Sequence, residues 1–169
     1  AGKRVILADE DFRMGGRLNA ETFAIGQTQG ADWAAGVVAE LASLPNVRLM
    51  TRTTVIGAFD HGIYGAVERV SDHLAVPAKG KPRQILWRIY AGRAILAAGA
   101  TERPVAFENN DRPGIMLAGA LRAYANRWGA KAGERVAVFT NNDDGLRTAK
   151  DLQAKGVDVV AVIDSREGG

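Results

Sequence analysis

Three consecutive acidic residues follow a short apolar segment near the start of the sequence. Residues 5–8 are Val-Ile-Leu-Ala, and Asp9, Glu10 and Asp11 come directly after them. Open α/β sheets bind ligands at the carboxyl ends of their strands. A carboxylate there can accept hydrogen bonds from both ribose hydroxyls and repels a 2′-phosphate, so the pattern favours NAD or FAD over NADP. The alternative interpretation is that these acids are only solvated, as acids at strand ends often are.

Two segments of small residues could bring the backbone close to such a nucleotide. Gly15 and Gly16 precede Arg17, whose side chain could then reach a phosphate or the adenosine. Residues 97–100 are Ala-Ala-Gly-Ala, and small side chains there allow close approach of a ligand. The alternative is tight packing of a strand under a crossing helix. The acids and the order of the elements together favour the nucleotide site.

A second glycine-rich turn would be required for a second nucleotide, and it is degenerate in this sequence. When VAVFTNNDDG is aligned with G-x-G-x-x-G, only Gly145 matches, and Thr140 and Asn142 replace the first two glycines. Asp143 and Asp144 would lie at a helix N-terminus, where they stabilise the helix dipole and oppose an incoming anion. The sequence therefore predicts a Rossmann-like unit that has lost its nucleotide site.

The elements that must position these residues alternate between strands and helices. Hydrophobic patterning predicts a loop over 12–30 and helices over 31–44, 115–128 and 143–156. It predicts strands over 4–9, 47–51, 53–60, 63–70, 83–91, 93–100, 134–140 and 157–165. The expected fold is α/β: a Rossmann-like doubly wound parallel sheet with an inserted antiparallel β-meander, plus part of a second Rossmann-like unit.

This order predicts two domains of the kind found in flavoproteins with two dinucleotide-binding domains. Residues 1–104 would form a partial NAD-binding domain that lacks its first strand and glycine-rich turn. Residues 105–169 would form a connector helix and a partial second unit. The sequence thus reads as an interior segment of a larger protein, and in isolation we expect it to be marginally stable or prone to association, because a buried sheet edge would be exposed.

Composition excludes several other classes of protein. The 169 residues are 47% hydrophobic with a net charge of +3, as in a soluble globular protein, and no basic block alternates with aromatics as nucleic-acid binding requires. There is no cysteine, and His61 and His73 are too few for a histidine-rich metal site and are expected to be exposed. Trp33, Trp87 and Trp128 are expected to serve packing. No signal peptide or long apolar span occurs, which indicates no membrane and a cytoplasmic location.

With these residues in view, the sequence resembles the α subunit of heterotetrameric sarcosine oxidase. The resemblance is carried by ADEDFRMGGRL, RTTVIGAFDHGIY, RAILAAGATERPVAFENNDRPGIMLAGALRAYANRWG and VAVFTNNDDG, which lie throughout the chain. Subunits of opine oxidase and hydrogen cyanide synthase are similar in outline, and their first site would hold FAD. A non-catalytic scaffold of nucleotide-type folds is the alternative from another class.

The resemblance implies a large subunit with a reductase-like part and an aminomethyltransferase-like part that handles tetrahydrofolate. NAD would bind in this segment without an evident role in hydride transfer. FAD and FMN would belong to the β subunit or its interface, and γ and δ subunits would complete the heterotetramer. The complex would oxidise sarcosine to glycine, reduce O2 to H2O2 and pass a one-carbon unit to tetrahydrofolate. This segment would hold no catalytic residue.

By position, the resemblance also assigns contacts with the nucleotide. Asp9 and Glu10 would hold the ribose, and Asp11 and Arg17 would lie near the adenosine or phosphates. The remaining contacts would be Gly16, Val55 at the adenine, and Ala98 and Gly99 on the pyrophosphate side. The segment without its phosphate-binding helix is expected to bind NAD poorly, because that helix N-terminus holds the pyrophosphate.

Overall fold

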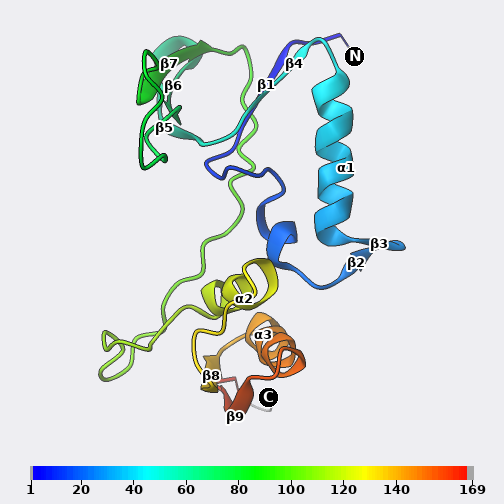
Figure 1. The fold of residues 1–169 in the computed structure, drawn as a ribbon, viewed down its shortest axis with the longest axis vertical. Helices are drawn as coiled ribbons and strands as arrows, with labels where there is room; N and C mark the ends of the chain where they lie inside the picture. Colours follow the sequence, from blue (N-terminus) through cyan, green and yellow to red (C-terminus); the bar gives the residue numbers. More distant parts are fainter. Residues whose placement is uncertain (1, 167–169) are drawn as a thin grey trace. The chain divides into compact units, whose positions relative to one another are not determined.

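The computed structural model describes residues 2–166 and shows two compact units (Figure 1). The first unit comprises the chain up to Gly16 together with Asp32–Ala98. The second comprises Arg17–Ala31 together with the chain from Gly99 onward. The sequence-based boundary lies after residue 104, whereas the two units divide after Ala98. Residues 17–31 differ from the prediction, because they fall in the second unit.

The first unit contains a parallel pair of strands joined by a helix. Strands β1 (Val5–Ala8) and β4 (Val47–Met50) pair in parallel, and helix α1 (Gly30–Ser43) lies between them in the chain. Asp32 lies in the first turn of α1 and Pro45 follows its end, as predicted for a helix with these boundaries. The predicted β-α-β order is confirmed.

The first unit also contains the predicted β-meander. Strands β5 (Thr53–Phe59), β6 (Ile63–Arg69) and β7 (Gln84–Tyr90) form one antiparallel sheet in the order β5-β6-β7. A short 3-10 turn, η2 (Asp60–Gly62), joins β5 to β6. His61 in this turn is exposed, as expected.

The predicted strand over residues 93–100 is wrong. The structure assigns no strand there, and Ile95 and Leu96 are 93% and 92% exposed. A strand exists only where a neighbour satisfies its backbone hydrogen bonds. Within residues 2–166, β1 and β4 pair only with each other. Residues 93–100 therefore have the apolar composition of a strand but no neighbouring strand with which to pair.

The predicted loop over residues 12–30 is in part structured. A short 3-10 helix, η1, covers Gly16–Ala20. Strands β2 (Ala24–Ile25) and β3 (Thr28–Gln29) then form a two-residue antiparallel pair. Neither element has the length or periodicity that sequence patterning detects.

The second unit is built around a strand-helix-strand motif. Helix α2 (Ala118–Arg127) precedes β8 (Arg135–Thr140), α3 (Asp143–Ala154) and β9 (Asp158–Asp164), and β8 and β9 pair in parallel. This order confirms the prediction of a second Rossmann-like unit. Its core consists of the buried residues Ala125, Leu152 and Val157 with Leu121, Val136 and Val159 packed against them.

Residues 2–166 contain neither a membrane-spanning helix nor a cluster of metal ligands. No helix there has the length and apolar character needed to cross a membrane. In the same residues, no group of three or more His, Asp or Glu side chains gathers as a metal site would need.

Candidate functional site

Asp9 is held rigidly at the carboxyl end of β1. Its backbone N–H donates to the Met50 carbonyl at 2.9 Å, and its own carbonyl accepts from the Thr53 N–H at 2.9 Å. Its Oδ1 accepts from the Asp11 N–H at 2.9 Å, a turn that Asp commonly forms with the residue two positions on. The other carboxylate oxygen of Asp9 has no hydrogen-bond partner among the described residues.

Glu10 presents a carboxylate at the same strand end. Its main-chain carbonyl accepts from the Arg69 guanidinium at 2.9 Å, which fixes the backbone. The side chain is exposed, and no hydrogen bond or ion pair holds its carboxylate within residues 2–166. Asp9 and Glu10 therefore offer acceptor oxygens on a fixed backbone, which is the donor-acceptor chemistry that ribose hydroxyls require.

The other predicted contacts of the first unit flank this strand end. Asp11 accepts from the Arg13 N–H at 3.3 Å, and its carbonyl accepts from the Arg52 N–H at 2.8 Å. Gly16 has φ 52°, a left-handed conformation that favours glycine. Val55 is 51% exposed on β5, the strand whose first residue bonds to Asp9.

Ala98 and Gly99 lie in the segment that lacks secondary structure. Both are exposed, and Gly99 has φ 69°. A β-carbon built on Gly99 would meet nothing within 4 Å, so its backbone is open to approach. The pyrophosphate contact of these residues stays a prediction, and the predicted strand that would present them does not form in this chain.

Arg17, predicted near adenosine or phosphates, lies in the second unit and binds carboxylates. Its guanidinium donates to Asp144 at 2.8 and 3.0 Å and to Glu21 at 3.0 Å. The hydrogen bond that Arg17 donates to Asp144 is the main reason that the pKa of Arg17 is raised. The charge predicted to meet a phosphate is therefore already neutralised by two acids.

Arg122 forms the buried centre of this cluster. Its side chain is 2% exposed and contacts Asp144 at 3.0 Å and Glu21, itself 4% exposed, at 3.3 Å. Burial opposes ionisation of Asp144, but hydrogen bonds from Arg17 and the charge of Arg122 outweigh it, so the pKa of Asp144 is lowered. Sequence analysis missed Arg122, although an arginine within the apolar pattern of a helix was the available signal.

A second set of polar contacts connects residues 17–22 to helices α2 and α3. The Thr22 hydroxyl donates to Asp151 at 2.9 Å. The Asn126 amide donates to the Ala20 carbonyl and to Asp151, both at 3.0 Å. Because Asn126 belongs to α2 and Asp151 to α3, these bonds place residues 17–22 in the second unit.

The N-terminus of α3 is occupied by the chain's own side chains. The Asn142 side chain caps it by accepting from the Asp144 N–H at 2.9 Å, and Asp143 pairs with Arg166 at 2.9 Å. A phosphate would meet these two acids where a Rossmann fold normally offers free N–H groups. The arrangement agrees with the degenerate turn predicted from the sequence.

A cavity of about 290 Å³ lies beside this end of β8 in the second unit. Glu102 lines it and accepts from the N–H groups of Ala118 at 3.1 Å and Gly119 at 2.7 Å, so a carboxylate also caps α2. Both helix N-termini at the cavity thus already have an acceptor from the chain itself. The acidic end of β1 is the better candidate site.

The fold of the chain matches that of a solved structure and defines its class. The structure matches L-proline dehydrogenase from P. horikoshii with a TM-score of 0.75 over 97% of this chain and 32% of that chain. The two sequences are 24% identical, so the match shows the fold alone. The chain is a Rossmann-like α/β protein with parallel and antiparallel sheets.

The similar sequences identify a narrower class of protein than the fold does. The chain is 52% identical over 166 residues to the sarcosine oxidase subunit alpha of Rhizobium meliloti (strain 1021). It is 46% and 44% identical to the subunits of that name from Corynebacterium sp. strains P-1 and U-96. The matches cover 98–99% of this chain and 17% of each relative, and no family model matches. The resemblance to a segment of the sarcosine oxidase α subunit is therefore confirmed.

Proposed function

We propose that this chain is the NAD-binding portion of the α subunit of a sarcosine oxidase. The observation that carries the proposal is the acidic end of β1, where Asp9 is fixed by three hydrogen bonds and Glu10 is exposed and unpaired within the described residues. These carboxylates fit the two hydroxyls of the adenosine ribose. They disfavour a 2′-phosphate because it would bring like charges together.

In this proposal the nucleotide contacts come from short segments of the first unit and from Gly99, the residue that directly follows it in the chain. Asp9 and Glu10 accept the ribose hydroxyls, and Asp11 lies at the adenosine. Gly16 permits close approach, Val55 contacts the adenine, and Ala98 and Gly99 line the pyrophosphate. We assign Arg17 to the carboxylate cluster instead, because its charge is already matched there.

The reaction of the whole complex is part of the same proposal. An oxidoreductase with β, γ and δ subunits, FAD and FMN would convert sarcosine to glycine in the cytoplasm. Oxygen would be reduced to H2O2 and a one-carbon unit passed to tetrahydrofolate. The chain spans 17% of its relatives' length. Its own residues would bind and orient the nucleotide and take no part in the chemistry.

The test uses the full-length α subunit purified within its complex. The protein is quenched with acid, and the released nucleotides are identified by chromatography and mass spectrometry. One NAD per α subunit supports the proposal. FAD released from the α subunit alone would assign the chain to the opine oxidase and cyanide synthase group. Absence of any nucleotide on this subunit would leave only the scaffold function.

A further inference from the structure

The β5-β6-β7 sheet has an inner face whose polar groups are satisfied. Ala66 on β6 lies opposite Trp87 on β7 and has no exposed surface. The Trp87 indole N–H donates to the Glu68 carboxylate at 2.7 Å. The Arg48 guanidinium of β4 lies 4.3 Å from the centre of a Trp87 ring. This face is therefore partly covered within the first unit.

The outer face is identified by the pairing register. Residues directly opposite each other in an antiparallel ladder project to the same side. Phe59 lies opposite Ile63, which lies opposite Tyr90, so these three share one face. The next rows of the same face are Gly57, Gly65 and Arg88, then Thr54, Val67 and Leu86, then Arg69 and Gln84.

A β-bulge adds one more apolar residue to the outer face. The register shifts between Val55 and Gly57, which leaves Ile56 between them. A β-carbon on Gly65 would meet Ile56 Cγ1 at 3.5 Å and Phe59 Cε2 at 3.3 Å. The Ile56 and Phe59 side chains therefore both lie over Gly65.

Most of this apolar surface is exposed. Leu86 is 72% exposed, Tyr90 69%, Phe59 61% and Ile56 59%. A sheet face turned to water normally carries polar residues, and contiguous apolar surface marks an interaction site. We call the surface formed by Ile56, Phe59, Leu86, Arg88 and Tyr90 the outer patch.

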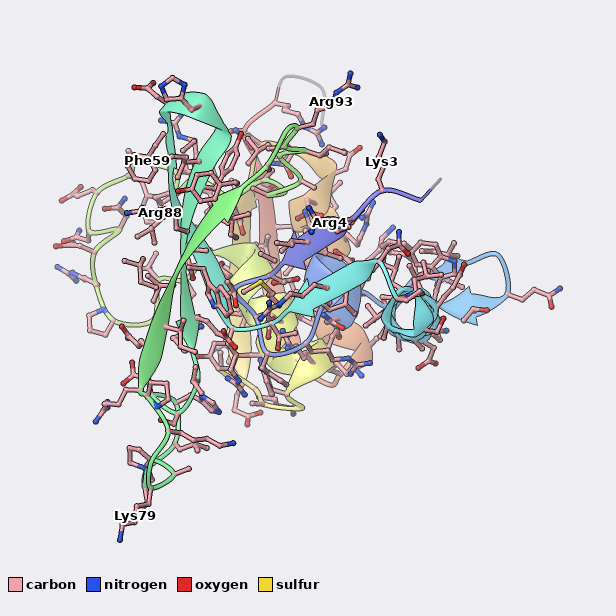
Figure 2. All side chains as sticks on the ribbon, turned by 90° about the horizontal axis from the view of Figure 1, so that it is seen from above. Lys3, Arg4, Phe59, Lys79, Arg88 and Arg93 are labelled. Atoms are coloured by element: carbon pink, nitrogen blue, oxygen red, sulfur yellow. The ribbon has the colours of Figure 1, made fainter. Side chains whose placement is uncertain are left out.

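The charge of the outer patch specifies what it can bind. Arg69 and Arg88 are the charged strand residues on this face, and no acid of β5, β6 or β7 projects there. Arg69 donates to the Glu10 carbonyl, whereas no carboxylate pairs with Arg88 among the described residues. Figure 2 shows Arg88 and Phe59 on the same outer side of the sheet. An apolar surface carrying a carboxylate would complement this patch.

We propose that the outer patch is a docking surface for another subunit of the same complex, through an apolar region that carries an acidic side chain. Aromatic residues and arginine are the types enriched at the centres of protein interfaces. The choice of another subunit follows from the relatives, which are α subunits by name. The inference rests on the α-subunit part of the proposed function and does not depend on the nucleotide.

The test compares three variants of the full-length α subunit. Leu86→Lys and Arg88→Glu alter the outer patch, and Val76→Lys is the matched control, because Val76 is 83% exposed but lies outside the three strands. For each, the dissociation constant for the purified remaining subunits is measured, with the Tm and bound nucleotide of the free α subunit. We expect binding to weaken at least about tenfold for the two patch variants, with Tm unchanged.

Two other results would overturn the inference. Unchanged affinity of both patch variants would show that no subunit docks there. A lower Tm for both patch variants, but not for Val76→Lys, would show that the patch is covered by the α subunit's own chain. Nucleotide content is read separately, so weakened assembly together with an α subunit free of NAD would reject the proposed nucleotide and retain the docking surface.

Discussion

Gly145, near the start of α3, lies so close to Thr140 at the end of β8 that a β-carbon on residue 145 would overlap the Thr140 side chain. In a G-x-G-x-x-G turn the first two glycines serve the nucleotide, and the third serves close packing of helix and strand. The second unit has replaced the first two and retains the third. Its packing function therefore persists where its phosphate function does not.

Gly145→Ala is expected to destabilise the second unit by about 1–3 kcal/mol or more, since the added methyl group overpacks a buried position. Gly36→Ala is the matched control, because Gly36 lies inside α1 and a β-carbon there would meet nothing within 4 Å. The control should stabilise by about 0.4–1 kcal/mol. Urea unfolding of the whole chain, followed by circular dichroism, measures both, and equal midpoints would contradict this account.

Arg122→Met is expected to lower the free energy of unfolding by about 3–5 kcal/mol, because it leaves the buried Glu21 carboxylate without its buried partner. Arg147→Met is the control, because Arg147 is 52% exposed and 3.9 Å from Asp144. That exposed pair should contribute less than about 1 kcal/mol. Denaturant titration of both variants gives the comparison. Similar losses of unfolding free energy in Arg122→Met and Arg147→Met would show that the buried ion pairs of Arg122 stabilise the protein no more than an exposed pair does.

The Asp144 carboxylate should make the second unit sensitive to acid. Its pKa is lowered in the folded state, so its contribution to stability is present above its unfolded pKa of about 3.9 and is lost as pH falls through the folded value. The free energy of unfolding is measured against pH for the wild type and for Asp144→Asn. The difference between the two curves gives the contribution of Asp144 without that of the other acids. The difference in unfolding free energy should be constant near neutral pH and shrink below about pH 4. A difference in unfolding free energy that grows as the pH falls would contradict the lowered pKa of Asp144.

Glu10→Gln in the full-length α subunit should weaken NAD binding by roughly 10- to 100-fold, the loss expected for hydrogen bonds to a charged acceptor. Because the Glu10 side chain is exposed, the Tm should not change. Glu134→Gln is the control, with an 84% exposed side chain near β8 in the second unit. Calorimetric titration of NAD into nucleotide-free protein measures the effect. Equal affinity in the two variants would remove Glu10 from the proposed site.

Local patterning predicted the elements whose signals are local. Helix α1 was predicted by its apolar stripe between Asp32 and Pro45, and the β8-α3-β9 unit by two apolar runs that flank an amphipathic helix. Residues 93–100 show the limit of this approach. Their composition resembles a buried strand, but pairing depends on a neighbour that composition does not reveal.

The carboxylate cluster could not be predicted for a related reason. Arg17 and Asp144 are separated by 127 positions, and Thr22 and Asp151 by 129. No periodicity links such distant residues, and each alone looks like an ordinary surface charge or hydroxyl. The acidic end of β1 was accessible to sequence analysis because strand and acids are contiguous. The position of its backbone depends on hydrogen bonds to Met50 and Thr53, which lie some forty residues later.

The path of the chain between the two units limits how they can be separated. The chain passes from one unit to the other after Gly16, after Ala31 and again after Ala98. A single protease cut in the connector that follows Ala98 would therefore leave residues 17–31 covalently joined to the first unit, while the part of the second unit that begins at Gly99 would be held to them by non-covalent contacts alone. For the same reason, a gene fragment that begins after residue 98 would encode the second unit without Arg17 and Glu21, and would leave Arg122 buried with one acid instead of two. The second unit therefore depends on a segment, residues 17–31, from which the first unit separates it in the sequence.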